Sequence, residues 1–347
     1  MANILEGLPI MDKPTTDDDF WKNESVALLA LASIQGVGYW TLYKLAKTPQ
    51  SFKQVLKIET KESFISALKE LGSRSVKLSA AEWSIEQESI WQAGRQMYHS
   101  LIRGDINILH AGQPGFPKRL QAIPDAPAWL FYQGNIELLD KPAVAMVGTR
   151  HPTQDGDFLA HFMVSLCHNY DISTISGLAD GIDQQVHLYS LRYGLPTISV
   201  LGTGMLRDFP TGSEKLRREI IDRGGLILTE YLPNQSYSAE NFVRRNRLQS
   251  ALSKIVVPIE WKAKSGTAHT VRFAAEHQRP ILCLRLPDWS SSQHTELAVG
   301  LQLGGKIFTV PDDAETIRAF IGFACNGAVV KSRQLELWSS KNPPGES

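Results

Sequence analysis

The stretch AVAMVGTRHPTQDG, residues 143–156, carries the signal from which the fold of this chain can be inferred. Its apolar run, 143–147, leads directly into Gly148, Thr149 and Arg150. A short apolar run that ends in small residues is typical of a buried strand followed by a tight turn. An arginine just after such a turn is well placed to bind a phosphate. The stretch therefore predicts a phosphate site with three candidate ligands: a dinucleotide cofactor, a small nucleotide, or a nucleic-acid backbone.

Similar apolar runs recur from residue 106 onward. Segments with helical periodicity, for example 157–169, 181–193, 213–223 and 266–277, separate most of them. Strands that alternate with helices indicate βαβ units and a parallel sheet with helices on both faces. We therefore expect residues 106–325 to form a Rossmann-like, doubly wound α/β domain with a mostly parallel sheet. The expected strands are 106–109, 128–132, 143–147, 173–176, 197–201, 226–229, 255–259, 281–286 and 306–310.

Residues 20–105 have the pattern of a small helical domain. The stretch ESVALLALASIQGVGYWTLYKLAKT, residues 24–48, places apolar residues at helical spacing on both sides of Gly36 and Gly38. A helix, a glycine turn and a second helix are typical of helix-hairpin-helix or SAM-like DNA-binding modules, but a plain packed hairpin has the same pattern. Residues 1–19 are expected to form a flexible arm and residues 326–347 a disordered tail.

Composition limits the classes of partner. Lys and Arg together number 36, as do Asp and Glu, so the formal net charge is zero and any nucleic-acid site must be a local patch. The three cysteines lie far apart without metal-site spacing, which suggests free thiols in a reducing compartment. The chain has neither a signal-peptide pattern at its start nor an apolar run long enough to span a membrane. We expect a cytoplasmic protein with no metal and no membrane partner.

The segments that follow the expected strands are rich in Gly, Ser and Thr. Because the carboxyl ends of parallel strands share one edge of the sheet, these segments predict an anion-binding crevice there. GTRHPTQDG (148–156) is not a GxGxxG motif, LGTGM (201–205) lacks the third glycine, and no GxxxxGK[ST] motif is present. The sequence therefore predicts no dinucleotide cofactor, and no other cofactor is expected.

The segment ENFVRRNRLQSALSK, residues 240–254, is unusually basic. Arg244, Arg245 and Arg247 stand close together, and residues 241–254 contain no acid. Arginine makes bidentate contacts with phosphate, and nearby Phe242 and Tyr237 could stack on unpaired bases. The alternative is that these arginines pair with acids elsewhere in the fold.

Seven segments in register resemble the motifs of the DprA/Smf family of DNA-processing proteins. They are GFPKRLQAIPDAPAWLFYQGN (115–135), VAMVGTR (144–150), SGLADGIDQQVH (176–187), TISVLGTGMLRDFP (197–210), GGLILTEY (224–231), NFVRRNRLQSALSK (241–254) and SGTAHTVRFAAEHQRPIL (265–282). Two departures from the family pattern are clear. Val243 stands where the family has a proline before its RNR sequence, and the family's PG…GxNxLI pattern is missing after residue 286.

The resemblance implies a Rossmann-like protein that binds single-stranded DNA, delivers it to a RecA-type recombinase in natural transformation, forms a homodimer and has no catalytic activity. It places Arg150, Ser176, Gly177, Arg245, Arg247 and, less directly, Lys215 in the family's DNA pocket. Together with the residues chosen from composition, the candidate phosphate-binding set is Gly148, Arg150, Ser176, Gly177, Lys215, Phe242, Arg244, Arg245, Asn246, Arg247, Ser265, Gly266 and Thr267.

Two other functions stay open. The family fold is related to that of nucleoside-monophosphate phosphoribohydrolases, which carry a catalytic glutamate where this chain has Thr270, although Glu230 and Glu260 follow expected strands. The second alternative is a sensor that binds a small nucleotide in the same crevice. A divergent relative with a role in genome defence is also compatible with the motifs.

Overall fold

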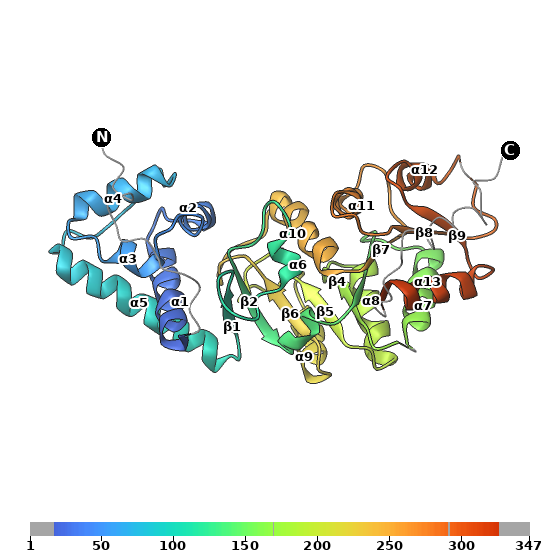
Figure 1. The fold of residues 1–347 in the computed structure, drawn as a ribbon, viewed down its shortest axis with the longest axis horizontal. Helices are drawn as coiled ribbons and strands as arrows, with labels where there is room; N and C mark the ends of the chain where they lie inside the picture. Colours follow the sequence, from blue (N-terminus) through green and yellow to red (C-terminus); the bar gives the residue numbers. More distant parts are fainter. Residues whose placement is uncertain (1–16, 169, 291, 326–347) are drawn as a thin grey trace.

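The computed structural model describes residues 17–168, 170–290 and 292–325. A helical region comes first and lies beside an α/β domain, to the left in Figure 1. Its first and fifth helices pack lengthwise against each other. The helices of this region are α1 (Asp18–Ser33), α2 (Tyr39–Leu45), α3 (Phe52–Leu56), α4 (Lys61–Glu70) and α5 (Trp83–Arg103).

The first helix begins within the segment that we expected to be a flexible arm. Asp17 is its N-cap, and the Asp17 carboxylate accepts hydrogen bonds from the backbone N–H groups of Asp19 and Phe20. Asp18 and Asp19 therefore belong to α1, because a capped N-terminus with acidic residues in its first turn is a stable helix start. Residues 1–16 and the expected tail, 326–347, lie outside the described residues.

The glycine turn between α1 and α2 is packed against the chain that follows α4. Gly36 has a positive φ of 95°, and a Cβ atom there would collide with the Ser75 carbonyl. Ser73 donates a hydrogen bond to the Gly36 carbonyl, and Gln35 pairs with Lys77 as an isolated bridge. The hairpin thus has the expected form, and its turn serves packing within the helical region.

The main sheet has the strand order β1-β2-β6-β5-β4-β3-β7. Its central strands, from β6 through β5, β4 and β3 to β7, run parallel, whereas β1 and β2 are antiparallel to their neighbours. Each expected run overlaps one strand, and the predicted mostly parallel α/β fold is confirmed. The strands of this sheet are β1 (Asn107–His110), β2 (Trp129–Gly134), β3 (Ala143–Gly148), β4 (Ser173–Ser176), β5 (Thr197–Val200), β6 (Leu226–Thr229) and β7 (Ile255–Ile259).

Apolar residues on both faces explain why the sheet is covered twice. Side chains alternate along a strand, so Ala143 and Ala145 of β3 face one layer while Val144 and Met146 face the other. One buried cluster includes residues of α6, α10 and α11, and the other includes residues of α7, α8 and α13. The helices and the 3₁₀ segment of this domain are α6 (Lys118–Gln121), η2 (Ile136–Leu139), α7 (Gln154–Cys167), α8 (Ile182–Arg192), α9 (Glu214–Asp222), α10 (Ala239–Leu252), α11 (Gly266–Glu276), α12 (Thr295–Gln302) and α13 (Ala314–Cys325).

The last strands form a separate parallel pair, β8 (Leu282–Arg285) and β9 (Lys306–Thr309). A bridge between Val256 and Ile281 connects this pair to β7 of the main sheet. None of the described helices combines the length and the apolar character that crossing a bilayer requires. The described part of the chain likewise contains no group of three or more His, Cys, Asp or Glu residues arranged to hold a metal ion.

Candidate nucleic-acid interface

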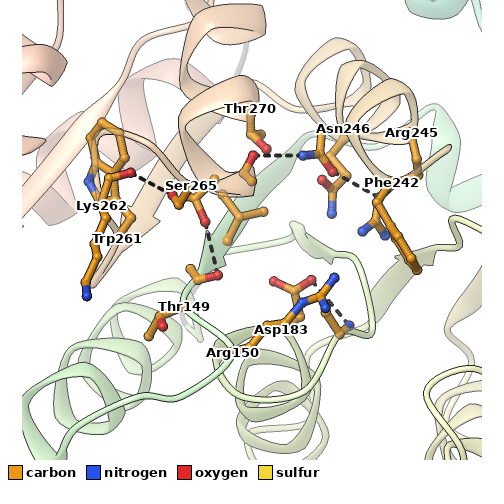
Figure 2. A pocket seen from close by; sticks show the side chains of 16 residues that line it. Thr149, Arg150, Asp183, Phe242, Arg245, Asn246, Trp261, Lys262, Ser265 and Thr270 are labelled. Carbon is orange, nitrogen blue, oxygen red and sulfur yellow. Dashed lines mark hydrogen bonds between the residues drawn. The ribbon is translucent and has the colours of Figure 1, made fainter. Parts of the chain in front are cut away.

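A pocket of about 350 Å³ opens where β3 and β7 end (Figure 2). These strands are neighbours in the sheet but not in the sequence. From β3 the chain continues through β4, β5 and β6 on one side, and it then returns to form β7 on the other side of β3. Open α/β sheets bind ligands at such a reversal of strand order, because the loops diverge there and leave a crevice. The lining residues are Val147, Gly148, Thr149, Arg150, Ala179, Asp183, Phe242, Arg245, Asn246, Gln249, Trp261, Lys262, Ser265, Gly266, Thr267 and Thr270.

The loop after β3 places Arg150 at the mouth of the pocket. The backbone of Thr149 holds this loop on two sides: its N–H donates to the Glu260 carbonyl, and its carbonyl accepts from the Ile182 N–H, both at 3.1 Å. Arg150 is exposed, and its guanidinium lies 5.5 Å from the centre of the Phe242 ring. Among the residues that the structure describes, no carboxylate forms an ion pair with Arg150. Its charge is therefore available to an anionic ligand.

The N-terminus of α11 forms the opposite wall. The Ser265 hydroxyl donates to the Lys262 carbonyl at 2.7 Å, so no side chain caps the first turn of the helix. The Thr267 hydroxyl donates to the Gly148 carbonyl at 3.0 Å and thereby ties α11 to the end of β3. Uncapped N–H groups at a helix N-terminus attract anions. Lys262, which is exposed beside this turn, adds a second cation.

Arg245 forms the floor of the pocket and is only 3% exposed. Its Nη1 donates to the carbonyls of Val200 and Gly177, the latter at 2.7 Å. A larger residue at position 177 would displace both side chains, since a Cβ atom would collide with this guanidinium and with the carboxylate of Asp183. Burial raises the pKa of Asp183, and the charge of Arg245 opposes that rise. Arg245 therefore holds three segments of the fold together while contributing positive charge from below.

Asn246 also lines the pocket and connects its two helices. The Asn246 Nδ2 donates to the Gly266 carbonyl at 3.1 Å, and its Oδ1 accepts from the Nε of Arg245 at the same distance. Because Asn246 bridges α10 and α11, the positions of Phe242 and of the α11 N-terminus depend on each other.

The structure places Arg244 and Arg247 on the face of α10 that points away from the pocket. Arg247 is 1% exposed and binds the carboxylate of Glu230 through Nη1, at 2.5 Å, and Nη2, at 2.8 Å. Its Nε contacts the Asp125 carboxylate at 2.5 Å. The guanidinium of Arg244 lies 4.6 Å from the Trp40 ring of the helical region. For these two arginines the geometry matches the alternative of pairing within the fold.

Two further residues of the candidate set lie outside the pocket lining. The Ser176 hydroxyl is buried and donates to the Met146 carbonyl at 2.7 Å, so it ties β4 to β3. Lys215 is exposed in the first turn of α9. The structure therefore brings together Gly148, Arg150, Phe242, Arg245, Asn246, Ser265, Gly266 and Thr267, with Gly177 directly beneath them.

The candidate set omitted Thr149, Asp183, Gln249, Trp261, Lys262 and Thr270, which also line the pocket. A signal for Lys262 was present in the sequence. It lies three residues after β7, just as Arg150 lies two residues after β3, and the two strands are adjacent. The position of Asp183 beneath the floor depends on tertiary packing and has no comparable signal.

The carboxylates considered for hydrolysis are both engaged in the fold. The Glu260 Oε2 accepts a 2.8 Å hydrogen bond from the Thr153 N–H, at the start of α7. Glu230 binds Arg247 and accepts a 2.6 Å hydrogen bond from the Tyr39 hydroxyl. At the position of the hydrolase glutamate, the Thr270 hydroxyl is buried and has no hydrogen-bond partner within the described residues. Neither glutamate lines the pocket.

Comparisons with known proteins show which family and which proteins the chain is similar to. A family model described as DNA recombination-mediator protein A matches residues 107–315. DNA processing protein DprA of Streptococcus pneumoniae (strain ATCC BAA-255 / R6) is 35% identical over 169 residues, which are 49% of this chain and 59% of that protein. Protein Smf of Escherichia coli (strain K12) is 31% identical over 210 residues, 60% of this chain and 54% of that protein. The chain thus spans between half and three fifths of these relatives.

Two solved structures are similar over longer stretches. The X-ray structure of DprA from Streptococcus pneumoniae has a TM-score of 0.60 and 25% identity, and covers 85% of this chain and 97% of that one. A structure of DNA processing protein A from Helicobacter pylori has a TM-score of 0.54 and 27% identity, and covers 62% of this chain and 95% of that one. The Helicobacter pylori protein is described as having a unique single-stranded DNA binding mode.

Proposed function

The chain belongs to the DNA recombination-mediator protein A family, also known as DprA/Smf, and on that premise we propose that it binds single-stranded DNA through the pocket at the ends of β3 and β7. The observation that carries the proposal is the position of Arg150. Its guanidinium lies at the mouth of the pocket, without an ion-pair partner among the described residues, opposite the uncapped N-terminus of α11. Two cationic groups and a helix N-terminus that face one crevice favour a phosphate ligand.

The dimensions of the pocket favour a single strand over a duplex. A volume of about 350 Å³ is sufficient for a phosphate and part of one nucleotide. Phe242 is half-buried and lines the pocket, and an aromatic ring there suits stacking with an unpaired base, whereas the base faces of a duplex are covered by their neighbours. Phosphate binding with stacking does not depend on base identity, so we expect binding with little sequence preference.

We further propose that the chain delivers the bound strand to a RecA-type recombinase, acts as a homodimer and works in the cytoplasm during natural transformation or recombination. The family description, recombination mediator, supports the recombinase partner. Three buried cysteines, Cys167, Cys283 and Cys325, form no disulfide, which is compatible with a reducing compartment. A pull-down with a RecA-type recombinase in the presence of oligo-dT tests this step, and sedimentation tests the dimer.

Fluorescence anisotropy with labelled oligo-dT and the matching duplex tests the DNA proposal. The informative variants are Arg150→Ala and Lys262→Ala, since both side chains are exposed at the pocket and stabilise no buried acid. Arg223→Ala is the matched control, because Arg223 is exposed where α9 ends, at the opposite edge of the sheet. Arg245 and Arg247 are unsuitable for this purpose, since their removal leaves Asp183 or Glu230 without its cation.

Tighter binding of oligo-dT than of the duplex, weakened by both pocket substitutions and retained in Arg223→Ala, supports the proposal. Equal binding by all variants contradicts the location of the site. Absence of binding by the unmodified protein contradicts DNA binding itself, and screening with small nucleotides then tests the sensor alternative.

A further inference from the structure

Three aromatic rings lead from the pocket to the protein surface. Phe242 lines the pocket, and its ring centre lies 5.1 Å from that of Phe209 in the loop after β5. The Phe209 ring stacks on Tyr237, in the loop after β6, with 4.7 Å between centres and 28° between planes. Tyr237 is 60% exposed, so the outer ring faces solvent. We call Phe242, Phe209 and Tyr237 the aromatic track.

Backbone hydrogen bonds hold the two outer loops together. The Gly204 N–H donates to the Gln235 carbonyl, and the Leu206 N–H donates to the Pro233 carbonyl, both at 2.9 Å. The Arg207 Nε adds a 2.8 Å bond to the Asn234 carbonyl. Contacts of this kind fix the relative positions of the rings before any ligand binds, which reduces the entropy that binding must overcome.

Cations lie at the inner end of the aromatic track, and one acid lies beside its middle ring. At the inner end, Arg150 and Arg245 lie 5.5 and 5.9 Å from the Phe242 ring centre. Beside Phe209, the carboxylate of Asp208 accepts hydrogen bonds from the N–H groups of Gly212, at 2.7 Å, and Ser213, at 3.1 Å. The backbone N–H groups of the turn that follows therefore hold the Asp208 carboxylate in place. Cations lie at the pocket end, and an accessible ring face lies at the other.

We propose that Phe209 and Tyr237 form a second subsite, which stacks the base next to the nucleotide held in the pocket. This inference rests on the proposed function, because the neighbouring nucleotide exists only if the ligand is a strand. Stacking on an aromatic face accepts any unpaired base and excludes a paired one. The subsite lies over the ends of β5 and β6, so it directs the bound strand along the sheet edge and away from β7.

Anisotropy with labelled thymidylates of increasing length, from the mononucleotide upward, tests the subsite. The variants are Tyr237→Ala and Tyr237→Phe; both should fold, because the side chain is largely exposed. We expect Tyr237→Ala to weaken binding of the longer strands roughly 10-fold, the loss typical of one stacked base. The mononucleotide, which the pocket alone holds, should bind equally to all forms. Tyr237→Phe should match the unmodified protein, because it keeps the ring.

A second readout detects stacking directly. An oligonucleotide with one 2-aminopurine beyond the first nucleotide should lose fluorescence on binding to the unmodified protein and to Tyr237→Phe, and lose less on binding to Tyr237→Ala. If Tyr237→Ala binds every length as the unmodified protein does, with unchanged quenching, the second subsite is overturned while DNA binding in the pocket stands. If no form binds any strand, the proposed function fails together with the subsite.

Discussion

The hydroxyl of Tyr39 donates a 2.6 Å hydrogen bond to the carboxylate of Glu230, and this contact joins the helical region to the α/β domain. The same carboxylate binds the guanidinium of Arg247, so one buried group connects α2, the end of β6 and α10. The opposite face of α10 carries Phe242 and Arg245, which line the pocket. One face of α10 therefore takes part in the contact between the helical region and the α/β domain, and the opposite face lines the candidate DNA site.

We expect Arg247→Ala to destabilise the protein strongly. The substitution leaves Glu230 buried without its cation, and removal of one partner of a buried ion pair costs about 3–5 kcal/mol. Urea unfolding followed by circular dichroism measures the loss, with Arg223→Ala as an exposed control that should change little. Normal stability combined with weak DNA binding in Arg247→Ala would instead identify Arg247 as a ligand-binding residue.

Tyr39→Phe tests the same contact between the two regions with a smaller change. It removes only the hydroxyl that donates to Glu230, and a hydrogen bond to a charged group contributes about 1.5–3 kcal/mol. The expected result is a smaller decrease in the free energy of unfolding than in Arg247→Ala, with the affinity for oligo-dT preserved. An unchanged urea midpoint would show that the Tyr39 hydrogen bond adds nothing to the contact between the two regions.

The sequence contained part of the information that separates these two faces. Residues three apart share a side of a helix, so Arg244 and Arg247 form one group, and Phe242 and Arg245 another. What the sequence could not predict is which group meets the acids, because Asp125 and Glu230 come from distant loops and reach α10 only through the folded sheet. The strands were easier, since each is a short apolar run and the parallel order follows from the helices between them.

In the pocket too, some positions follow from the sequence pattern, and others depend on tertiary packing. Arg150 and the segment 265–267 were predictable, because they follow strands whose carboxyl ends must share an edge. Ser176 resembles a binding residue in sequence, but its hydroxyl points at the Met146 carbonyl of the neighbouring strand. The direction of one side chain at a strand end depends on packing, and no sequence pattern encodes it.

We expect the free energy of unfolding to decrease as the pH falls from about 6.5 to about 4. His110 is buried, stacks on Trp21 and shares a 2.9 Å hydrogen bond with the hydroxyl of Ser25. Burial lowers the pKa of His110 from 6.5 to about 4, so in this range the unfolded chain binds a proton that the folded chain does not. The linked loss is on the order of 3 kcal/mol for this one group.

Urea unfolding at several pH values, with the unmodified protein and His110→Gln, checks this expectation. The variant should be less stable at neutral pH and should lose less on acidification, because it lacks the group that titrates. Other groups, such as Glu24, whose pKa burial raises, act equally in both proteins and cancel in the comparison. Parallel pH profiles for the two proteins would contradict the assignment to His110.

Gly177→Ala should damage the pocket floor. The added methyl group would collide with the guanidinium of Arg245 and with Asp183, and overpacking of this kind costs about 1–3 kcal/mol. Because Arg245 must shift, we expect weaker binding of oligo-dT together with reduced stability. Ser176→Ala is the companion variant, since it removes one hydrogen bond next to Gly177 and should lower stability alone. Equal affinity in the two variants would show that the floor does not support ligand binding.

The salt dependence of binding should reveal how many phosphates the pocket neutralises. For single strands the logarithm of the binding constant falls with the logarithm of salt concentration, with a slope of about −0.7 per neutralised phosphate. If Arg150 and Lys262 each contact a phosphate, Arg150→Ala and Lys262→Ala should each make the slope shallower by about 0.7. The loss should be the same for oligo-dT and for mixed sequences, since backbone contacts read no bases. Anisotropy titrations at several salt concentrations measure both quantities. A slope unchanged in Arg150→Ala would mean that this guanidinium meets a base or the Phe242 ring rather than a phosphate, and a loss confined to one sequence would indicate base recognition.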